Sequence, residues 1–120
     1  MSVVQALADV LEQTVSNPEL CAAGVEFPRF YVKLQEIEAP GQGFRLELRR
    51  PLTLRILKEL EYWLVDDNKT KIWGTGESAG TAFLDYMREW QERLQWLKES
   101  EATLGPGLAK EYQKLQRLVA

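Results

Sequence analysis

The spacing of apolar residues changes in the second half of the chain, and this change restricts the fold more than any other feature. Apolar and charged residues alternate through 44–49, and related alternations occupy 30–35 and 52–56. A period of two places the apolar side chains on one face of a strand. From Phe83 to Leu97, apolar residues instead recur every three or four positions, which is typical of an amphipathic helix. The sequence therefore predicts an antiparallel sheet with one wet face, followed by helices.

Two further strands complete the expected sheet, which spans residues 29–76. Residues 62–65 are rich in strand formers, and a turn at 66–68 allows them to pair with residues 71–73. Residues 52–64 also contain good helix formers, but the local alternation favours a strand. Pro51 cannot donate a hydrogen bond to a ladder, so it marks a break, a bulge or an edge. We expect three or four strands.

Helices are expected both before and after these strands along the sequence. A short helix over 1–16 starts with Ser2 as a candidate N-cap, and a helical hairpin occupies 78–119. Its helices should pack antiparallel and can cover each other's apolar residues or the sheet, and we expect both of them to cover the sheet. The whole chain, 1–120, is expected to be a single α+β domain. Structural turn and cap positions are Gly74, Gly76, Ser78, Gly105 and Pro106.

The pair Gly74 and Gly76 has two interpretations. A strand that leads through glycines into a helix N-terminus suits phosphate binding. The dinucleotide-binding fingerprint needs a further glycine at position 79, which is alanine here. We therefore favour a tight turn from strand to helix. In the same way, the adjacent Asp66 and Asp67 favour a solvated turn over a metal site, because no further ligands follow at suitable spacing.

The composition excludes several kinds of catalytic and metal site. The 120 residues include no histidine and one cysteine, so a Ser-His-Asp unit, a Cys-His unit, a histidine zinc site and an internal disulfide are impossible within the chain. No pair of carboxylates stands out for acid–base catalysis. We expect no enzyme, no cofactor and no metal. The net charge of −3 gives no general attraction to nucleic acid. No apolar run approaches the length of a membrane span, and the start of the sequence lacks the pattern of a signal peptide, so we expect a cytoplasmic protein that does not enter a membrane.

Two groups of side chains are candidates for binding a partner. Four aromatic residues are candidates for exposed interface anchors: Tyr62, Trp63, Trp73 and Trp96. The alternative is that a sheet covered by helices, with both faces used, buries them. Trp63 and Trp73 lie on neighbouring expected strands and can face together. The second group, Arg45, Arg49 and Arg55 near Tyr31, suits phosphate contacts and base stacking. Cross-strand ion pairs explain the same arginines equally well.

Residues 72–87 resemble the end of a HicB-like antitoxin domain, in which a strand leads through aromatic-Gly-x-Gly-[Asp/Glu]-[Ser/Thr] into a helix. The matching positions here are Gly74, Gly76, Glu77, Ser78 and Ala82. Residues 49–56 are similar to the family's second strand. Residues 104–108 resemble the Leu-Gly-Pro-x-Leu turn of uncharacterised HicB-like proteins with a second C-terminal helix. The chain departs from the pattern at Gly80 and Thr81, where the family usually has Glu-Glu, and at 65–68, where it usually has Leu-Pro-[Glu/Asp]-Leu.

The resemblance implies a three-stranded antiparallel sheet with a packed helix, a degenerate relative of the ribonuclease H fold. It also implies a non-catalytic module that self-associates and that binds and blocks a small protein partner, a basic toxin. Two alternatives from the residues stay open. One is a small nucleic-acid-binding protein that uses the arginine-bearing sheet face, and the other is a subunit of a homo-oligomeric scaffold.

Overall fold

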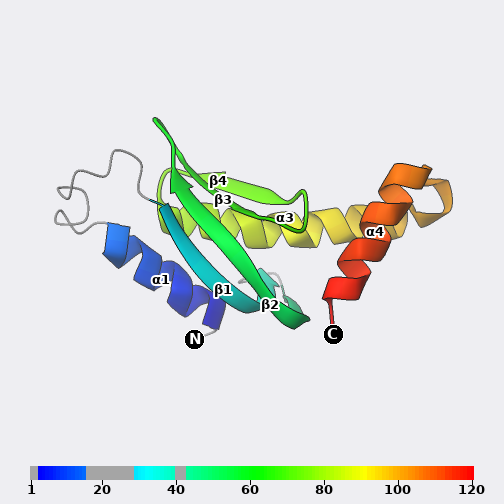
Figure 1. Ribbon diagram of the computed structural model, residues 1–120, viewed down its shortest axis with the longest axis horizontal. Helices are drawn as coiled ribbons and strands as arrows, with labels where there is room; N and C mark the ends of the chain where they lie inside the picture. The colour runs from blue at the N-terminus through cyan, green and yellow to red at the C-terminus, as the bar shows by residue number, and fades with distance from the viewer. Residues whose placement is uncertain (1–2, 16–28, 40–42) are drawn as a thin grey trace.

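The computed structural model describes residues 3–15, 29–39 and 43–120. This part of the chain forms a four-stranded antiparallel sheet and three α-helices, so the predicted α+β class is confirmed (Figure 1). Ser2, Cys21 and the residues between the first helix and the sheet lie outside the described residues. None of the helices in the described ranges is both long and apolar enough to cross a membrane.

The sheet is a simple meander in which each strand pairs with the next along the chain. Its strands are β1 (Arg29–Ala39), β2 (Phe44–Lys58), β3 (Trp63–Asp67) and β4 (Trp73–Gly76), in the order β1-β2-β3-β4. The alternation predicted from the sequence is clearest in the second half of β2 and in β3, where every second residue is buried while the residues between them are not: Leu52, Leu54, Ile56, Trp63 and Val65.

Strand β2 is continuous where the sequence predicted two separate runs. Its pairing with β1 shifts between Leu34 and Glu36, so that residues 48–51 of β2 oppose a single residue of β1. Pro51 lies in this bulge, where its missing N–H breaks no ladder hydrogen bond. The bulge confirms one of the three alternatives for Pro51. Leu48 and Leu52 are both buried, so the apolar face continues through the irregularity.

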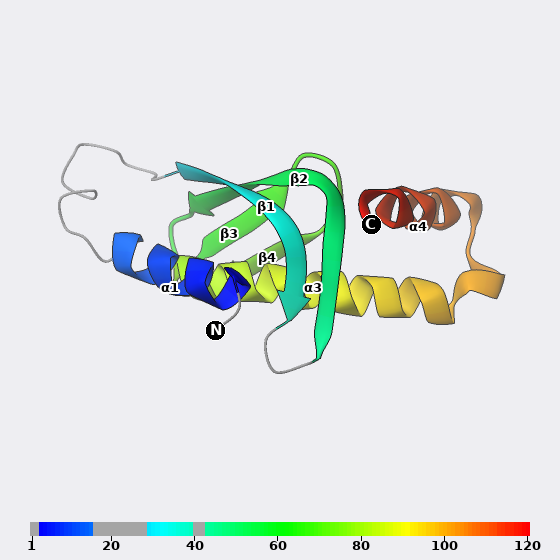
Figure 2. The same ribbon diagram turned by 90° about the horizontal axis from the view of Figure 1, so that it is seen from below.

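Two helices cover one face of the sheet. Helix α3 (Ala79–Glu99) packs across β3 and β4, and helix α1 (Val3–Val15) lies beside it on the same side (Figure 2). Helix α1 agrees with the helix expected over 1–16. Together these elements bury a single core, whose fully buried members include Val4, Ile56, Phe83, Tyr86, Met87 and Trp90.

The two glycines expected to form a turn are part of strand β4. Both face α3, and a Cβ on Gly74 would overlap the backbone nitrogen of Tyr86. A Cβ on Gly76 would likewise overlap the side chain of Thr81. The glycines are therefore needed for the close approach of helix and strand, and the expectation of a Gly74–Gly76 turn is wrong.

Ser78 is the N-cap of α3, as predicted. Its Oγ accepts a hydrogen bond from the backbone N–H of Thr81 at 3.2 Å, and the Thr81 Oγ1 accepts one from the N–H of Ser78 at 3.0 Å. This reciprocal capping box satisfies two backbone donors that a helix start leaves unpaired. Ser78 Oγ also donates to the carboxylate of Glu12, which ties α1 to the start of α3.

Helix α4 (Pro106–Leu118) does not cover the sheet, which corrects the expectation of two covering helices. It follows the short 3₁₀ helix η1 (Glu101–Thr103), with Gly105 as its N-cap and Pro106 in its first turn. Helix α4 packs on the C-terminal part of α3 and on β2. An isolated bridge joins Val119 to Leu48, so the chain end is held against the first half of β2.

Candidate binding surface

The face of the sheet opposite α1 and α3 is not covered by any helix in the described part of the chain (Figure 2). The strand registers place alternate residues of all four strands on this side. We call this surface the open sheet face, and it consists of Arg29, Tyr31, Lys33, Thr53, Arg55, Leu57, Leu64, Asp66, Trp73 and Thr75.

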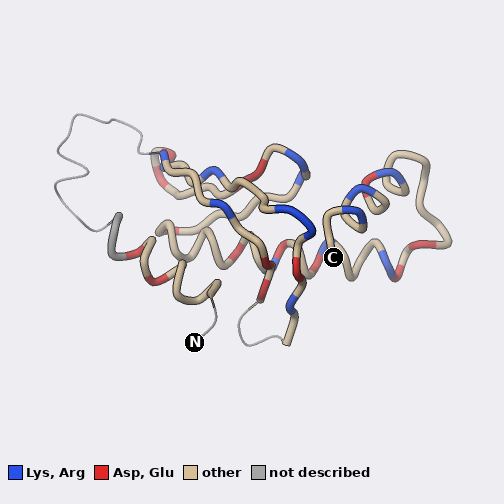
Figure 3. Tube along the Cα trace, turned by 60° about the horizontal axis from the view of Figure 1, so that its bottom comes forward, with Lys and Arg blue, Asp and Glu red and all other residues tan. Residues whose placement is uncertain are grey.

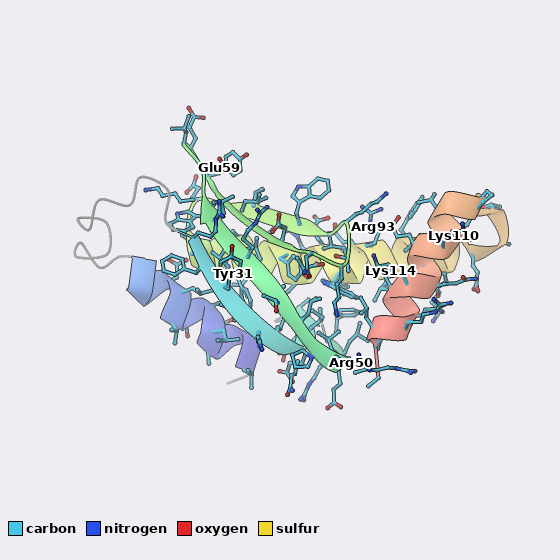
Figure 4. All side chains as sticks on the ribbon, in the orientation of Figure 1. Tyr31, Arg50, Glu59, Arg93, Lys110 and Lys114 are labelled. Carbon is cyan, nitrogen blue, oxygen red and sulfur yellow. The ribbon has the colours of Figure 1, made fainter. Side chains whose placement is uncertain are left out.

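One row of directly opposed residues crosses the open sheet face from edge to edge. Tyr31 is opposite Arg55, Arg55 is opposite Asp66, and Asp66 is opposite Trp73. The two outer members are exposed aromatic rings, with Tyr31 64% and Trp73 56% accessible. Figure 4 looks onto this face and labels Tyr31 in front of the strands. We call these four residues the central row.

A bidentate ion pair occupies the middle of the central row. The Arg55 Nε and Nη2 donate to the two carboxylate oxygens of Asp66 at 3.0 and 2.6 Å. These hydrogen bonds, and then the charge of Asp66, raise the pKa of Arg55 above its ordinary value. Both side chains remain partly exposed, so the pair adds little to stability. Its effect is to hold a planar guanidinium in one orientation between the two aromatic residues.

Charges on the open sheet face are unevenly distributed. Arg29 and Lys33 are exposed on β1, two residues before and two residues after Tyr31. Neither belongs to an ion pair in the described part of the chain, whereas Asp66 is paired. The edge of the face at β1 is therefore positive, although the chain as a whole is acidic. Lys and Arg also gather on β2 and α4, while the charged residues of α1 are all acidic (Figure 3).

Hollows border the central row on both sides of Asp66. One open hollow of about 370 Å³ lies between Tyr31, Arg55 and the start of the β3–β4 turn. Another, of about 450 Å³, lies between Leu64, Asp66 and Trp73. Leu57 and Leu64 are paired across β2 and β3 and are half-buried, so apolar area adjoins the charged pair. The surface can thus receive protruding side chains or bases.

Asp67 fixes the turn that presents Trp73. It points toward the helices, where its Oδ1 accepts from the backbone N–H groups of Lys69 and Thr70 at 2.7 and 2.6 Å. Its Oδ2 accepts from the hydroxyls of Thr70 and Tyr86, each at 2.6 Å. Burial, followed by the charge of Asp67, raises the pKa of Tyr86, so its hydroxyl stays protonated and donates.

The two adjacent aspartates point to opposite faces of the sheet. Asp66 belongs to the open sheet face and Asp67 to the β3–β4 turn, and the described residues contain no group of three or more residues able to hold a metal ion. We expected both carboxylates to lie in a solvated turn, but each of them makes side-chain hydrogen bonds.

The four aromatic candidates lie in four different environments. Trp73 belongs to the open sheet face, Tyr62 lies exposed in the turn between β2 and β3, and Trp96 is 47% accessible on α3. Trp63 is only 5% accessible and stacks on Phe30, with ring centroids 6.5 Å apart. Trp63 and Trp73 cannot face together, because Trp63 is opposite Gly76 and points to the helices. Trp63 is therefore a core residue.

The three arginine candidates do not form one patch, and each already contacts an acceptor. Arg45 pairs with Glu36 at 2.9 Å, and Arg49 donates from Nε to the carbonyl oxygen of Val119 at 2.8 Å. Arg55 pairs with Asp66 within the central row. Arg45 and Arg55 thus form the cross-strand ion pairs that were the alternative to phosphate binding.

Sequence reasoning missed the contributions of Arg29, Leu57 and Leu64. Their positions depend on the register of β2 against its neighbours, which alternation within a single strand does not give. Leu64 lies in the apolar run 62–65, so nothing local distinguishes it from core residues such as Leu54. Leu57 is out of phase with Leu54 and Ile56, and this phase is the signal that could have placed it on the open side. Arg29 precedes the alternating run at 30–35, which gave no reason to include it.

Comparisons of this chain with protein-family models, with curated proteins and with solved structures find no match. The resemblance to HicB-like domains is therefore one of residue pattern alone.

Proposed function

We propose that this protein is a non-catalytic module that binds a small protein partner on the open sheet face. The central row carries this proposal. Exposed Trp and Tyr side chains flank an oriented Arg, and these three residue types dominate the binding energy of protein interfaces. The resemblance to HicB-like antitoxins adds the expectation that binding sequesters the partner, a toxin in that family.

The charges of the face suggest which part of a partner would contact it. Among the described residues, Arg29 and Lys33 form no ion pair, and Asp66, the carboxylate of this face, is paired. Like charges brought together at an interface cost free energy. A basic toxin would therefore present a neutral or acidic patch to this face. On α3, burial and then the charges of Glu92 and Asp85 raise the pKa of Glu89.

Affinity capture from the source cells tests the proposal. The tagged chain should recover one small protein, and Trp73→Ala should weaken that complex about thirtyfold, the effect of a hot-spot residue worth about 2 kcal/mol. Trp96→Ala is the matched control, because Trp96 is similarly exposed on α3. Equal recovery by the two variants, or no partner at all, contradicts the proposal. A stable oligomer that buries Trp73 without a second protein would favour the homo-oligomeric scaffold instead.

The cations of β1 favour a second candidate, single-stranded nucleic acid. Tyr31 lies between Arg29 and Lys33 along one strand, an arrangement that suits a base stacked between two phosphate contacts. Fluorescence anisotropy with a labelled oligonucleotide tests it. Affinity should fall steeply with salt, and the double variant R29Q/K33Q should lower the slope of log affinity against log salt by about 1.4, at about 0.7 for each phosphate contact.

The control for this second candidate is K110Q/K114Q, which removes two cations from α4 (Figure 4). That variant should leave the slope unchanged. Absence of binding at low salt, or an equal loss in both double variants, excludes a nucleic-acid site on the open sheet face.

A further inference from the structure

A second apolar surface lies at the other end of the molecule, away from the open sheet face. It is a groove of about 590 Å³ between the first half of β2, the C-terminal half of α3 and helix α4. Its apolar lining comes from all three elements: Phe44, Leu46, Leu94, Tyr112 and Val119. We call it the C-terminal groove. Its volume is within the range of about 300–1,000 Å³ that is usual for small-molecule sites.

Contacts at the chain end hold the C-terminal groove in place. Val119 bridges to Leu48, the N–H of Ala120 donates to the carbonyl oxygen of Glu47 at 2.8 Å, and Arg49 donates to the Val119 carbonyl. Beneath these contacts, the side chain of Leu115 is buried in the core. Arg93 of α3 also reaches Glu111 of α4 at 3.6 Å. The groove is therefore a preformed feature with half-buried apolar walls.

The charged side chains that line the C-terminal groove have one sign. Arg49 and Lys98 line it together with three glutamines, and no carboxylate side chain does. Neither Arg49 nor Lys98 belongs to an ion pair in the described ranges. This is a clear local asymmetry, because the chain has 18 acidic residues and 15 basic ones. Exposed Arg50, Lys110 and Lys114 add positive charge at the same end (Figure 4).

We propose that the C-terminal groove binds a single-chain anionic amphiphile, an alkyl carboxylate. Its alkyl chain would lie against Leu46, Leu94 and Tyr112, where burial of methylene groups is favourable. Its carboxylate would meet Lys98 and the guanidinium nitrogens of Arg49 that do not contact Val119. This site is separate from the open sheet face, so it does not depend on the function proposed above.

Isothermal titration with octanoate, decanoate and dodecanoate below their micelle concentrations tests the proposal. Affinity should increase about fourfold for each added methylene, which corresponds to about 0.8 kcal/mol per buried CH₂. Dodecylamine should bind more weakly than dodecanoate because the groove is lined by cations. Affinity that is independent of chain length, or tighter binding of the amine, overturns the proposal.

Variants locate the binding in the C-terminal groove. Leu94→Gln should weaken dodecanoate binding about tenfold, and Leu57→Gln, which alters a half-buried leucine on the open sheet face, should not. Lys98→Gln should weaken it two- to fivefold, and Lys71→Gln, an exposed site on the β3–β4 turn, should not. Because Lys98 is exposed, K98Q keeps the test valid if L94Q fails to fold. Equal effects within each pair, or a dimer that L94Q dissociates, would contradict the proposal.

Discussion

The two faces of the sheet use alternate residues of the same strands for different purposes. On the helix side, Leu54, Ile56 and Val65 are completely buried, and α3 approaches so closely that position 74 must be glycine. On the open side, Tyr31 and Trp73 remain more than half accessible. The comparison indicates that the helix side holds most of the stability and that the open side can be reserved for binding. Each prediction below tests that division.

The largest expected effect is on the helix side at Gly74. A Cβ there would overlap the backbone of Tyr86, which cannot move without shifting α3. We expect Gly74→Ala to lower the free energy of unfolding by about 4 kcal/mol or more, measured by urea denaturation. Gly107→Ala is the control, because a Cβ there meets no atom within 4 Å and α4 should gain a little stability. Similar stability for the two variants would disprove the close approach.

Two leucines of β2 compare the faces directly. Leu54 is fully buried under α3, whereas Leu57 is half-buried on the open side. Leu54→Ala should cost about 3 kcal/mol, since it leaves a cavity in the core. Leu57→Ala should cost less than about 1.5 kcal/mol. Thermal unfolding of both variants gives the ratio of the two losses of stability. A larger loss for Leu57→Ala would mean that the open face is a second core.

Tyr86 makes the stability of the helix side depend on alkaline pH. Burial raises its pKa in the folded protein above the value of about 10 in the unfolded chain. Its contribution is complete below pH 10 and is lost as pH rises further, at about 1.4 kcal/mol per pH unit, because only the unfolded chain releases the proton. Tyr86→Phe should cost about 1–2 kcal/mol at pH 7, since it removes the hydrogen bond to Asp67.

The difference between wild type and Tyr86→Phe isolates this residue from the lysines, which also titrate at high pH. The stability gap should therefore narrow above pH 10 in urea denaturation. A gap that stays constant up to pH 11.5 would show that Tyr86 does not carry the alkaline dependence.

The smallest expected effect on stability is on the open side. Asp66→Asn removes the charge that holds Arg55, but both groups are partly exposed. The cost should be below about 1 kcal/mol and should shrink further in 1 M NaCl, which screens exposed charges. A cost above 2 kcal/mol that salt does not reduce would make the central row a structural element.

Much of the fold follows from the sequence because its causes are local. Alternation located the strands, the missing N–H of Pro51 predicted a break, a bulge or an edge, of which the bulge is present, and Ser78 marked the start of α3. Gly74 and Gly76 were assigned to a turn because glycine supports both tight turns and close approach, and only packing distinguishes them. Helix α4 was expected to cover the sheet because its apolar residues recur at helical spacing. This spacing shows that the helix buries one face, but it does not show which element that face packs against.

The length of α3 explains where α4 lies. Its 21 residues extend about 32 Å at 1.5 Å per residue, whereas the five residues of β3 extend about 17 Å. Helix α3 therefore extends beyond β3, and the C-terminal part of α3 is free to pack against α4. The candidate surface was harder to predict, because Trp63 lies in the apolar run 62–65, whose two faces look alike, and Trp73 lies in a strand of only four residues. Their separation came from the pairing of Trp63 with Gly76.

Hydroxyl-radical footprinting of the chain, alone and in the complex recovered from source cells, tests the central claim most directly. Tyr31 and Trp73 are accessible when the chain is alone, and Trp96 is a comparably exposed reference on α3. We predict that the complex slows oxidation of Tyr31 and Trp73 at least fivefold and leaves Trp96 unchanged. Equal oxidation of Trp73 in the two states, or protection of Trp96 instead, would contradict binding on the open sheet face.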